Sequence, residues 1–541
     1  MSRGVLSLLA GGVLLAACSK PAEHPTAVAT AASTPAPAAS APAAGIGWIA
    51  AASDAEVDAA FALARAQNKP VFLYWGATWC PPCNQVRATL FNRQDFIERS
   101  RAFVPVSIDG DSPGAQKLGT RFKVRGYPTM LLFSASGVEL TRLPGEVDAA
   151  QYTELLMLGL SAQRPVKAVL ADALAGAALT PNEWRLLAFY SWETDEQQIV
   201  PKEPLAAVLQ QLAAACPAEQ HETATRLLLK ALAAREGKAR PKTDAAADAT
   251  ALARVLALLA DAGAARAQMD VLTNNAADLA RALSAAKTPQ RARLVEAFNT
   301  TLTALEADTT LSRADRLTAL FARVELAKLD RPKAAKPVLP DALLAEVRAH
   351  AARVDREITD GYERQAVITA AADLLAQAGL LDESDALLRA NLAKSHSPYY
   401  LMSELSANAR RRGDKSEALR WSQQAFDRAE GPATRLQWGA SYVNALVELA
   451  PRDEPRIERV VQQLFAEAAA QPNAFYERSA RSLQRVGTKL QAWNQGRAHA
   501  AALRRLQVQL DAVCAKLPAD DVQRGVCGGL LKPAAASKKT A

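Results

Sequence analysis

The chain has 541 residues, of which 64 are Lys or Arg and 56 are Asp or Glu, for a formal net charge of +8. This charge is dispersed along the chain and no nucleic-acid-binding motif accompanies it, so we expect no nucleic-acid partner. A positive surface favours anionic membrane or envelope surfaces, and the length is sufficient for more than one domain.

Residues 1–17 have the pattern of a signal peptide. Arg3 precedes an apolar run over residues 5–17, which is too short to span a bilayer because spanning takes about 20 residues. The run ends in Leu-Ala-Ala-Cys, which resembles the lipobox of bacterial lipoproteins. This resemblance implies cleavage before Cys18 and lipidation of that cysteine, and Ser19 resembles the second residue of proteins sorted to the outer membrane. An ordinary secretory signal and a cytoplasmic chain are the alternatives.

Residues 18–45 are predicted to be a tether that starts at the lipidated cysteine. Between residues 19 and 44 the chain is mainly Ala, Pro, Ser and Thr, with almost no large apolar side chain. Such a segment buries too little surface to fold, and its prolines favour extended conformations. We therefore expect a disordered segment that holds the folded part away from a membrane.

An α/β pattern follows the tether. The capping-box pattern of residues 53–56 predicts a helix that ends at Asn68, and the apolar run over residues 71–75 predicts a buried strand. Residues 84–90 contain no helix breaker and predict a second helix. Between this strand and this helix lies the motif Trp-Cys-Pro-Pro-Cys of residues 79–83.

Cys80 and Cys83 are the candidate catalytic pair. A strand that leads a C-x-x-C motif onto the first turn of a helix favours thiolate at the first sulfur, because a helix N-terminus carries partial positive charge. We expect Cys80 to be the more exposed sulfur and to attack a partner disulfide, and Cys83 to resolve the mixed disulfide. Half of a structural zinc site, which needs four ligands, and an inert core pair are the alternatives.

The motifs over residues 69–137 resemble those of the thioredoxin family. Trp79 to Cys83 matches the family's W-C-x-x-C, and residues 124–129 match its x-x-G-x-P-T loop. Residues 103–109 resemble the next central strand, and residues 130–137 the closing hairpin. Residues 46–162 are accordingly identified as a thioredoxin-like α/β sandwich, similar to the C-terminal domain of the bacterial transmembrane thiol–disulfide interchange protein.

The resemblance also implies a docking surface beside the cysteines. In the family, the proline that matches Pro128 has a cis peptide bond and lies against the cysteine pair, and a bond before proline is where a cis amide costs least. Pro128 would present the backbone of Tyr127 to an extended substrate segment, and Trp79 would shape the same surface. The alternative is that Pro128 only begins a strand.

Two positions depart from the usual thioredoxin pattern. Tyr74 stands where thioredoxins carry a buried aspartate, and Pro105 stands where they carry a lysine near it. The proton that this carboxylate is thought to relay must therefore pass through water or another group. Pro81 and Pro82 have no N–H, so we hypothesise a Cys80 thiolate that is only modestly stabilised and a relatively reducing couple.

Beyond residue 165 the strand signals disappear and amphipathic helical runs dominate. The clearest runs cover residues 205–215, 222–236, 246–262, 314–329 and 343–356. None is both long and uncharged enough to span a membrane. We predict a large all-α region over residues 163–530 and a disordered tail over residues 531–541.

Part of the helical region repeats, since residues 379–384 and 413–418 align with an offset of 34. Residues 413–425 resemble the second helix of a tetratricopeptide unit. The region is therefore predicted to be either a tetratricopeptide-like superhelix with a concave protein-binding surface or an irregular helical bundle. Cys514 and Cys527 are candidates for a structural disulfide, and Cys216 is expected to be a buried thiol.

Together these features predict a thiol–disulfide oxidoreductase, either a reductase or an interchange protein, anchored by lipid to the outer membrane and facing the periplasm. Its substrates would be protein disulfides and its electron donor another dithiol protein. Neither a metal nor an organic cofactor is expected. The alternatives are a disulfide oxidase or isomerase on the same scaffold, and an envelope scaffold whose helical region recruits partners.

Overall fold

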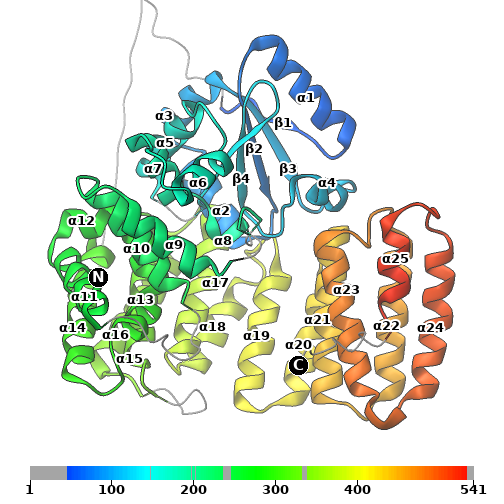
Figure 1. Cartoon of the computed structure of the whole chain (residues 1–541). Coiled ribbons are helices and arrows are strands. Elements are labelled where there is room, and N and C mark those ends of the chain that lie inside the picture. The colour runs from blue at the N-terminus through cyan, green and yellow to red at the C-terminus, as the bar shows by residue number, and fades with distance from the viewer. Residues whose placement is uncertain are drawn as a thin grey trace, which may run out of the picture. The chain divides into compact units, whose positions relative to one another are not determined.

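The computed structural model describes residues 45–145, 148–195, 198–200, 203–235, 245–331 and 338–532, all of which lie in the unit Ala44–Ala541 (Figure 1). The predicted signal peptide, Cys18 and the predicted tether up to residue 44 lie outside the described residues, as do residues 533–541 of the predicted tail. The tail was predicted to begin at residue 531, but Leu531 is buried in the apolar core of the helical region. The described chain contains its strands between β1 and α5, and it is helical from α6 to α25.

The strands form one five-stranded sheet in the order β1-β3-β2-β4-β5. The elements of this α/β part are β1 (Ile49–Ala50), α1 (Asp54–Gln67), β2 (Val71–Gly76), α2 (Pro81–Thr89), α3 (Gln94–Arg99), β3 (Val104–Asp109), α4 (Ala115–Phe122), β4 (Thr129–Phe133), β5 (Glu139–Leu143) and α5 (Ala149–Leu160). Strands β1, β3 and β2 are parallel, whereas β4 is antiparallel to both β2 and β5. The predicted α/β architecture is confirmed.

The central strand β2 is buried on both faces. Val71, Leu73 and Trp75 join an apolar cluster with α1 and α4, whereas Phe72 and Tyr74 join a cluster with α2, α3 and α5. A strand that helices cover on both sides requires a continuous apolar run rather than an alternating one. This requirement explains why the sequence is apolar throughout β2, the strand that leads to the cysteine pair.

The remainder of the described chain is helical. Its helices are α6 (Val166–Leu174), α7 (Pro181–Ala188), α8 (Trp192–Asp195), α9 (Leu205–Ala215), α10 (His221–Ala233), α11 (Ala245–Ala260), α12 (Ala262–Ala267), α13 (Met269–Leu283), α14 (Pro289–Ala307), α15 (Arg313–Ala327), α16 (Asp341–Glu357), α17 (Gly361–Gln377), α18 (Leu381–Asn391), α19 (Pro398–Arg412), α20 (Lys415–Arg428), α21 (Pro432–Leu449), α22 (Glu454–Ala469), α23 (Glu477–Trp493), α24 (Ala500–Ala515) and α25 (Val522–Gly529). The predicted all-α character is confirmed. Within the described ranges, no helix has both the length and the apolar character that crossing a bilayer demands.

One hydrophobic core crosses the position where we predicted a domain boundary, between residues 162 and 163. The cluster that holds Phe72 and Tyr74 continues through α5 into the side chains of α6, α7, α9 and α10, including Val169, Trp184 and Leu212. The first helices of the helical region are therefore packed against the α/β part through shared apolar side chains. The division at residue 162 stays a prediction.

The two segments that repeat in the sequence also repeat in the structure. Gly379 follows α17 with a φ of +87°, and Gly413 follows α19 with a φ of +80°. This left-handed conformation favours glycine because it has no Cβ. Each glycine leads into the next helix, α18 or α20. That these helix pairs form tetratricopeptide-like units stays a prediction.

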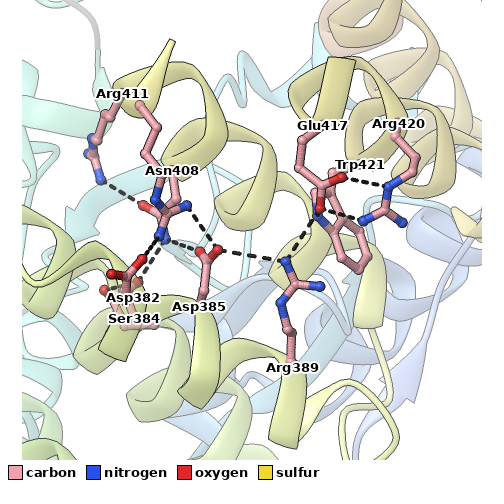
Figure 2. Close-up of polar contacts among 11 residues, drawn as sticks. Asp382, Ser384, Asp385, Arg389, Asn408, Arg411, Glu417, Arg420 and Trp421 are labelled. Atoms are coloured by element: carbon pink, nitrogen blue, oxygen red, sulfur yellow. Dashed lines mark hydrogen bonds and ion pairs between the residues drawn. The ribbon is translucent and has the colours of Figure 1, made fainter. Parts of the chain in front are cut away.

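A polar network connects α18, α19 and α20 (Figure 2). Asn408 of α19 donates to Asp385 of α18 at 2.9 Å, and Arg389 of α18 donates to Glu417 of α20 at 3.3 Å. A hydrogen bond from Arg420, at 2.8 Å, is the main reason that the pKa of Glu417 is lowered to about 2. Glu417 is therefore ionised at neutral pH, and its charge helps to hold α20 against α18.

Candidate active site

Helix α2 begins at the cysteine pair. Cys80 is the N-cap residue, Pro81 and Pro82 open the helix, and a disulfide joins Cys80 to Cys83 with the two Cα atoms 5.2 Å apart. Because the prolines have no N–H, Cys83 provides the first backbone donor of the helix, and its nitrogen lies 3.2 Å from Cys80 Sγ. The local sequence thus places Cys80 at the positive end of the helix, where a thiolate is favoured on reduction.

The loop before β4 meets the cysteine pair. The Tyr127–Pro128 peptide bond is cis, as the resemblance implied. The carbonyl oxygen of Tyr127 lies 3.7 Å from Cys80 Sγ, and the rings of Tyr127 and Trp79 have centroids 6.1 Å apart. Trp79, Tyr127 and Pro128 are therefore gathered around Cys80. That they dock a substrate stays a prediction.

Tyr74 occupies the position where the resemblance places a buried aspartate in thioredoxins. Its side chain is buried, and its ring lies edge-on to Phe91 with centroids 4.9 Å apart. Burial raises the pKa of its phenol, so Tyr74 is uncharged at neutral pH. It cannot act as a carboxylate relay for the proton of Cys83.

The α/β part of the chain is similar to known proteins. Residues 57–158 match the model of a family described as a thioredoxin-like domain. This part of the chain is a thioredoxin-like domain. Thioredoxin O2 from Arabidopsis thaliana, in its oxidised state, is 23% identical with a TM-score of 0.18, and the match covers 21% of this chain and 93% of that chain.

Two curated relatives match the thioredoxin-like domain more closely in sequence. The chain is 33% identical over 113 residues to the thiol:disulfide interchange protein DsbD 1 of Pseudomonas aeruginosa, covering 20% of this chain and 19% of that protein. It is 34% identical over 99 residues to the thiol:disulfide interchange protein DsbD of Yersinia pestis, strain Pestoides F, covering 17% of this chain and 16% of that protein. The chain thus matches less than a fifth of the length of either relative.

The cysteine pair of the thioredoxin-like domain is covered. Cys80 is 3% exposed and Cys83 is 0% exposed, so Cys80 is the more exposed of the two, as predicted, but both are buried. Both cysteines belong to an apolar cluster that includes side chains from α17 to α25, among them Tyr399 and Met402. A partner protein therefore cannot bring a disulfide into contact with Cys80 unless these helices move.

Five residues of the helical region contact the thioredoxin-like domain beside Cys80, and we call them the helical cover. They are Gln365, His396, Tyr400, Thr434 and Arg478. Two of them bind backbone carbonyl groups just before the cysteine pair. Gln365 Nε2 donates to the carbonyl oxygen of Trp79 at 3.3 Å, and His396 Nε2 lies 2.9 Å from that of Thr78.

Asp111 connects the helical cover to the indole of Trp79. One carboxylate oxygen accepts a hydrogen bond from Trp79 Nε1 at 2.8 Å and another from the Thr434 hydroxyl at 2.6 Å. The other oxygen accepts from the backbone N–H of Thr434 at 2.8 Å. Because both oxygens are engaged by the start of α21 and by Trp79, Asp111 fixes the distance between α21 and the redox motif.

Two further residues of the helical cover pack on the ring of Trp79. The Arg478 guanidinium lies 4.1 Å from the ring centroid, and the Tyr400 ring is stacked on it at 6.3 Å and 15°. The sequence motifs did not single out Asp111, Thr434 or Arg478. The latter two lie in ordinary amphipathic helices, and no local pattern marks them.

The other cysteines occupy separate places. Cys514 and Cys527 are joined by a disulfide between α24 and α25, with Cα atoms 5.6 Å apart. Cys216 is a free, buried thiol as expected, and burial raises its pKa to about 11. Within the described ranges, no group of three or more His, Cys, Asp or Glu side chains is arranged to hold a metal ion.

Proposed function

We propose that this protein is a thiol–disulfide oxidoreductase in which Cys80 and Cys83 are the reacting pair. The observation that carries the proposal is the Cys80–Cys83 disulfide at the start of α2, beside a cis-proline loop. The printed names of the DsbD relatives, thiol:disulfide interchange proteins, support the same chemistry.

The reaction is a two-step exchange. In the reduced protein the Cys80 thiolate attacks one sulfur of a partner disulfide, forms a mixed disulfide and releases the partner's other sulfur as a thiolate. Cys83 then loses its proton and attacks Cys80 Sγ, which releases the second partner sulfur and leaves the Cys80–Cys83 disulfide. Two electrons pass to the partner, so another dithiol protein must reduce the pair again.

Cys80 is assigned the attacking role from its surroundings. Its sulfur receives the first free backbone N–H of α2 and lies beside the carbonyl of Tyr127, whereas Cys83 is fully buried behind it. A partner segment would dock along Trp79, Tyr127 and Pro128. Since the helical cover lies over this surface, exchange proceeds from an open form in which the cover has moved away.

We further propose a cellular location for the protein. The signal-peptide pattern before Cys18 supports a lipid-anchored protein that faces the periplasm from the outer membrane. The reductase or interchange direction rests on the two prolines between the cysteines, which remove donors that would stabilise the thiolate. The helical region, with its two repeated helix pairs, would bind a partner protein in a tetratricopeptide-like manner.

Trapping tests the proposal. A Cys83→Ala variant retains the attacking sulfur but cannot resolve the mixed disulfide, so it should accumulate covalent adducts with a model disulfide protein such as scrambled ribonuclease, whose disulfides are intact but mispaired. A Cys80→Ala variant is the matched control and should accumulate far fewer, because Cys83 is more deeply buried. Equal trapping by the two variants, or none by either, would contradict the proposal.

A further inference from the structure

Arg478 lies between the two residues that flank the attacking sulfur. Its guanidinium carbon is 4.1 Å from the ring centroid of Trp79 and 5.4 Å from that of Tyr127. Trp79 precedes Cys80 in the chain, and the carbonyl oxygen of Tyr127 lies 3.7 Å from Cys80 Sγ. Arg478 lies near the start of α23, almost 400 positions after Cys80 in the chain. It therefore brings a positive charge to the edge of the redox motif.

The charge of Arg478 is not neutralised by a direct partner. Both terminal nitrogens are buried, and no carboxylate among the described residues accepts a hydrogen bond from them. Burial accordingly lowers the pKa of the guanidinium, which still remains protonated at neutral pH. A buried charge without a partner is costly, and the aromatic faces of Trp79 and Tyr127 offset only part of that cost.

The groups around Arg478 do not supply the missing anion. Asp111 is the acid whose charge acts on Arg478, and its two oxygens are already engaged by Trp79 and Thr434. The charged or titratable side chains that face this site are Asp111, Arg481, Glu404, Tyr127, Tyr399 and Tyr400. The charge of Arg481 is paired with Glu477 at 2.8 Å, and the phenols are neutral at neutral pH. Arg478 is therefore the cation beside the disulfide that has no carboxylate of its own.

We propose that Arg478 is the counter-charge of the Cys80 thiolate, a positioning residue that the helical region contributes to the redox site. The inference rests on the proposed function. Two electrons reduce the disulfide to a Cys80 thiolate and a Cys83 thiol, and Cys83 takes up one proton. The new negative charge pairs with Arg478 in the reduced state only, so Arg478 stabilises the reduced pair over the disulfide. Arg478 offsets only part of the stabilisation that is lost because Pro81 and Pro82 have no N–H.

The test compares four variants of the full protein in glutathione buffers. Arg478→Met and Arg478→Gln remove the charge, and Arg478→Lys keeps it. Arg481→Gln is the matched control, because Arg481 lies on the same helix and donates to the carbonyl oxygen of Arg125 at 2.9 Å across the same interface. Alkylation and peptide mass spectrometry measure the fraction of Cys80 and Cys83 in the disulfide at each buffer ratio, and absorbance at 240 nm follows thiolate formation with pH.

We expect loss of the charge to lower the equilibrium constant for reduction about tenfold, which for a two-electron couple makes the potential about 30 mV more negative. Thiolate should also form at a higher pH in both neutral variants. Arg478→Lys and Arg481→Gln should stay within threefold of the wild type. Unchanged neutral variants would overturn the inference, and so would an equal shift in Arg481→Gln, which would assign the effect to looser packing. A wild type that fails to equilibrate with glutathione would instead contradict the proposed function itself.

Discussion

Thr434 donates two hydrogen bonds to Asp111, one from its backbone N–H at 2.8 Å and one from its hydroxyl at 2.6 Å, although 323 positions separate the two residues. Asp111 also accepts a hydrogen bond from the indole of Trp79. A single carboxylate thus joins the helical region to the residue before Cys80. The access of any partner to the cysteine pair depends on contacts of this kind.

Removing the Thr434 hydroxyl should open the helical cover more often. A hydrogen bond to a charged group contributes about 1.5–3 kcal/mol, and about 1.4 kcal/mol is a factor of ten in an equilibrium. In Thr434→Val we therefore expect maleimide to label reduced Cys80 roughly tenfold faster than in the wild type, with the label located by peptide mass spectrometry.

Thr488→Val is the control for this experiment. Thr488 is exposed on α23, and its hydroxyl donates only to the carbonyl oxygen of Gln484 in its own helix. In Thr488→Val, maleimide should label reduced Cys80 at the same rate as in the wild type. Equal rates in all three proteins would mean that the Asp111 contact does not limit access to Cys80.

Glu404 should make stability depend on pH. Burial, and secondarily the charge of Asp373, raises its pKa from 4.5 to about 7. The folded protein therefore binds this proton more tightly than the unfolded chain does, so its contribution to stability is complete below about pH 4.5 and is lost as the pH rises to about 7. We expect Glu404→Gln to be more stable than the wild type at pH 8, on the order of 1–3 kcal/mol, and to lose this advantage at pH 4.5.

Glu448 provides a control of opposite sign. A hydrogen bond from Arg410 is the main reason that its pKa is lowered, so its ionised form stabilises the folded protein at neutral pH. Glu448→Gln should lower the melting temperature at pH 7 and have less effect as the pH falls. If Glu404→Gln and Glu448→Gln change the melting temperature in the same direction between pH 5 and pH 8, the interpretation of Glu404 is wrong.

Local sequence predicted the redox motif well because each of its elements has a local cause. The apolar run of β2, the prolines at the start of α2 and the proline at position 128 act within a few residues. The cover over Cys80 has no such cause. The helical pattern of α21 and α23 predicts that they are amphipathic, but it does not say that Thr434 would meet Asp111 or that Arg478 would meet Trp79. The burial of Cys80 under these helices was not predicted from the sequence for this reason.

The disulfide between α24 and α25 should stabilise the C-terminal end of the helical region. Cys514 and Cys527 are 13 positions apart in the sequence, and closing a loop of this size contributes about 3 kcal/mol in the chain-entropy model. Replacing both with alanine should lower the melting temperature by several degrees and leave glutathione equilibration at Cys80 and Cys83 unchanged. A double variant that melts with the wild type would show that the disulfide contributes little.

The proposed function requires reversible electron exchange at the sulfurs of Cys80 and Cys83. The most direct test is a redox titration of the wild-type protein across glutathione buffers, with peptide mass spectrometry counting free thiols at Cys80 and Cys83. We predict that both thiols appear and disappear together in one reversible two-electron step. A pair that stays oxidised in every buffer, or that stays reduced in every buffer, would contradict the account.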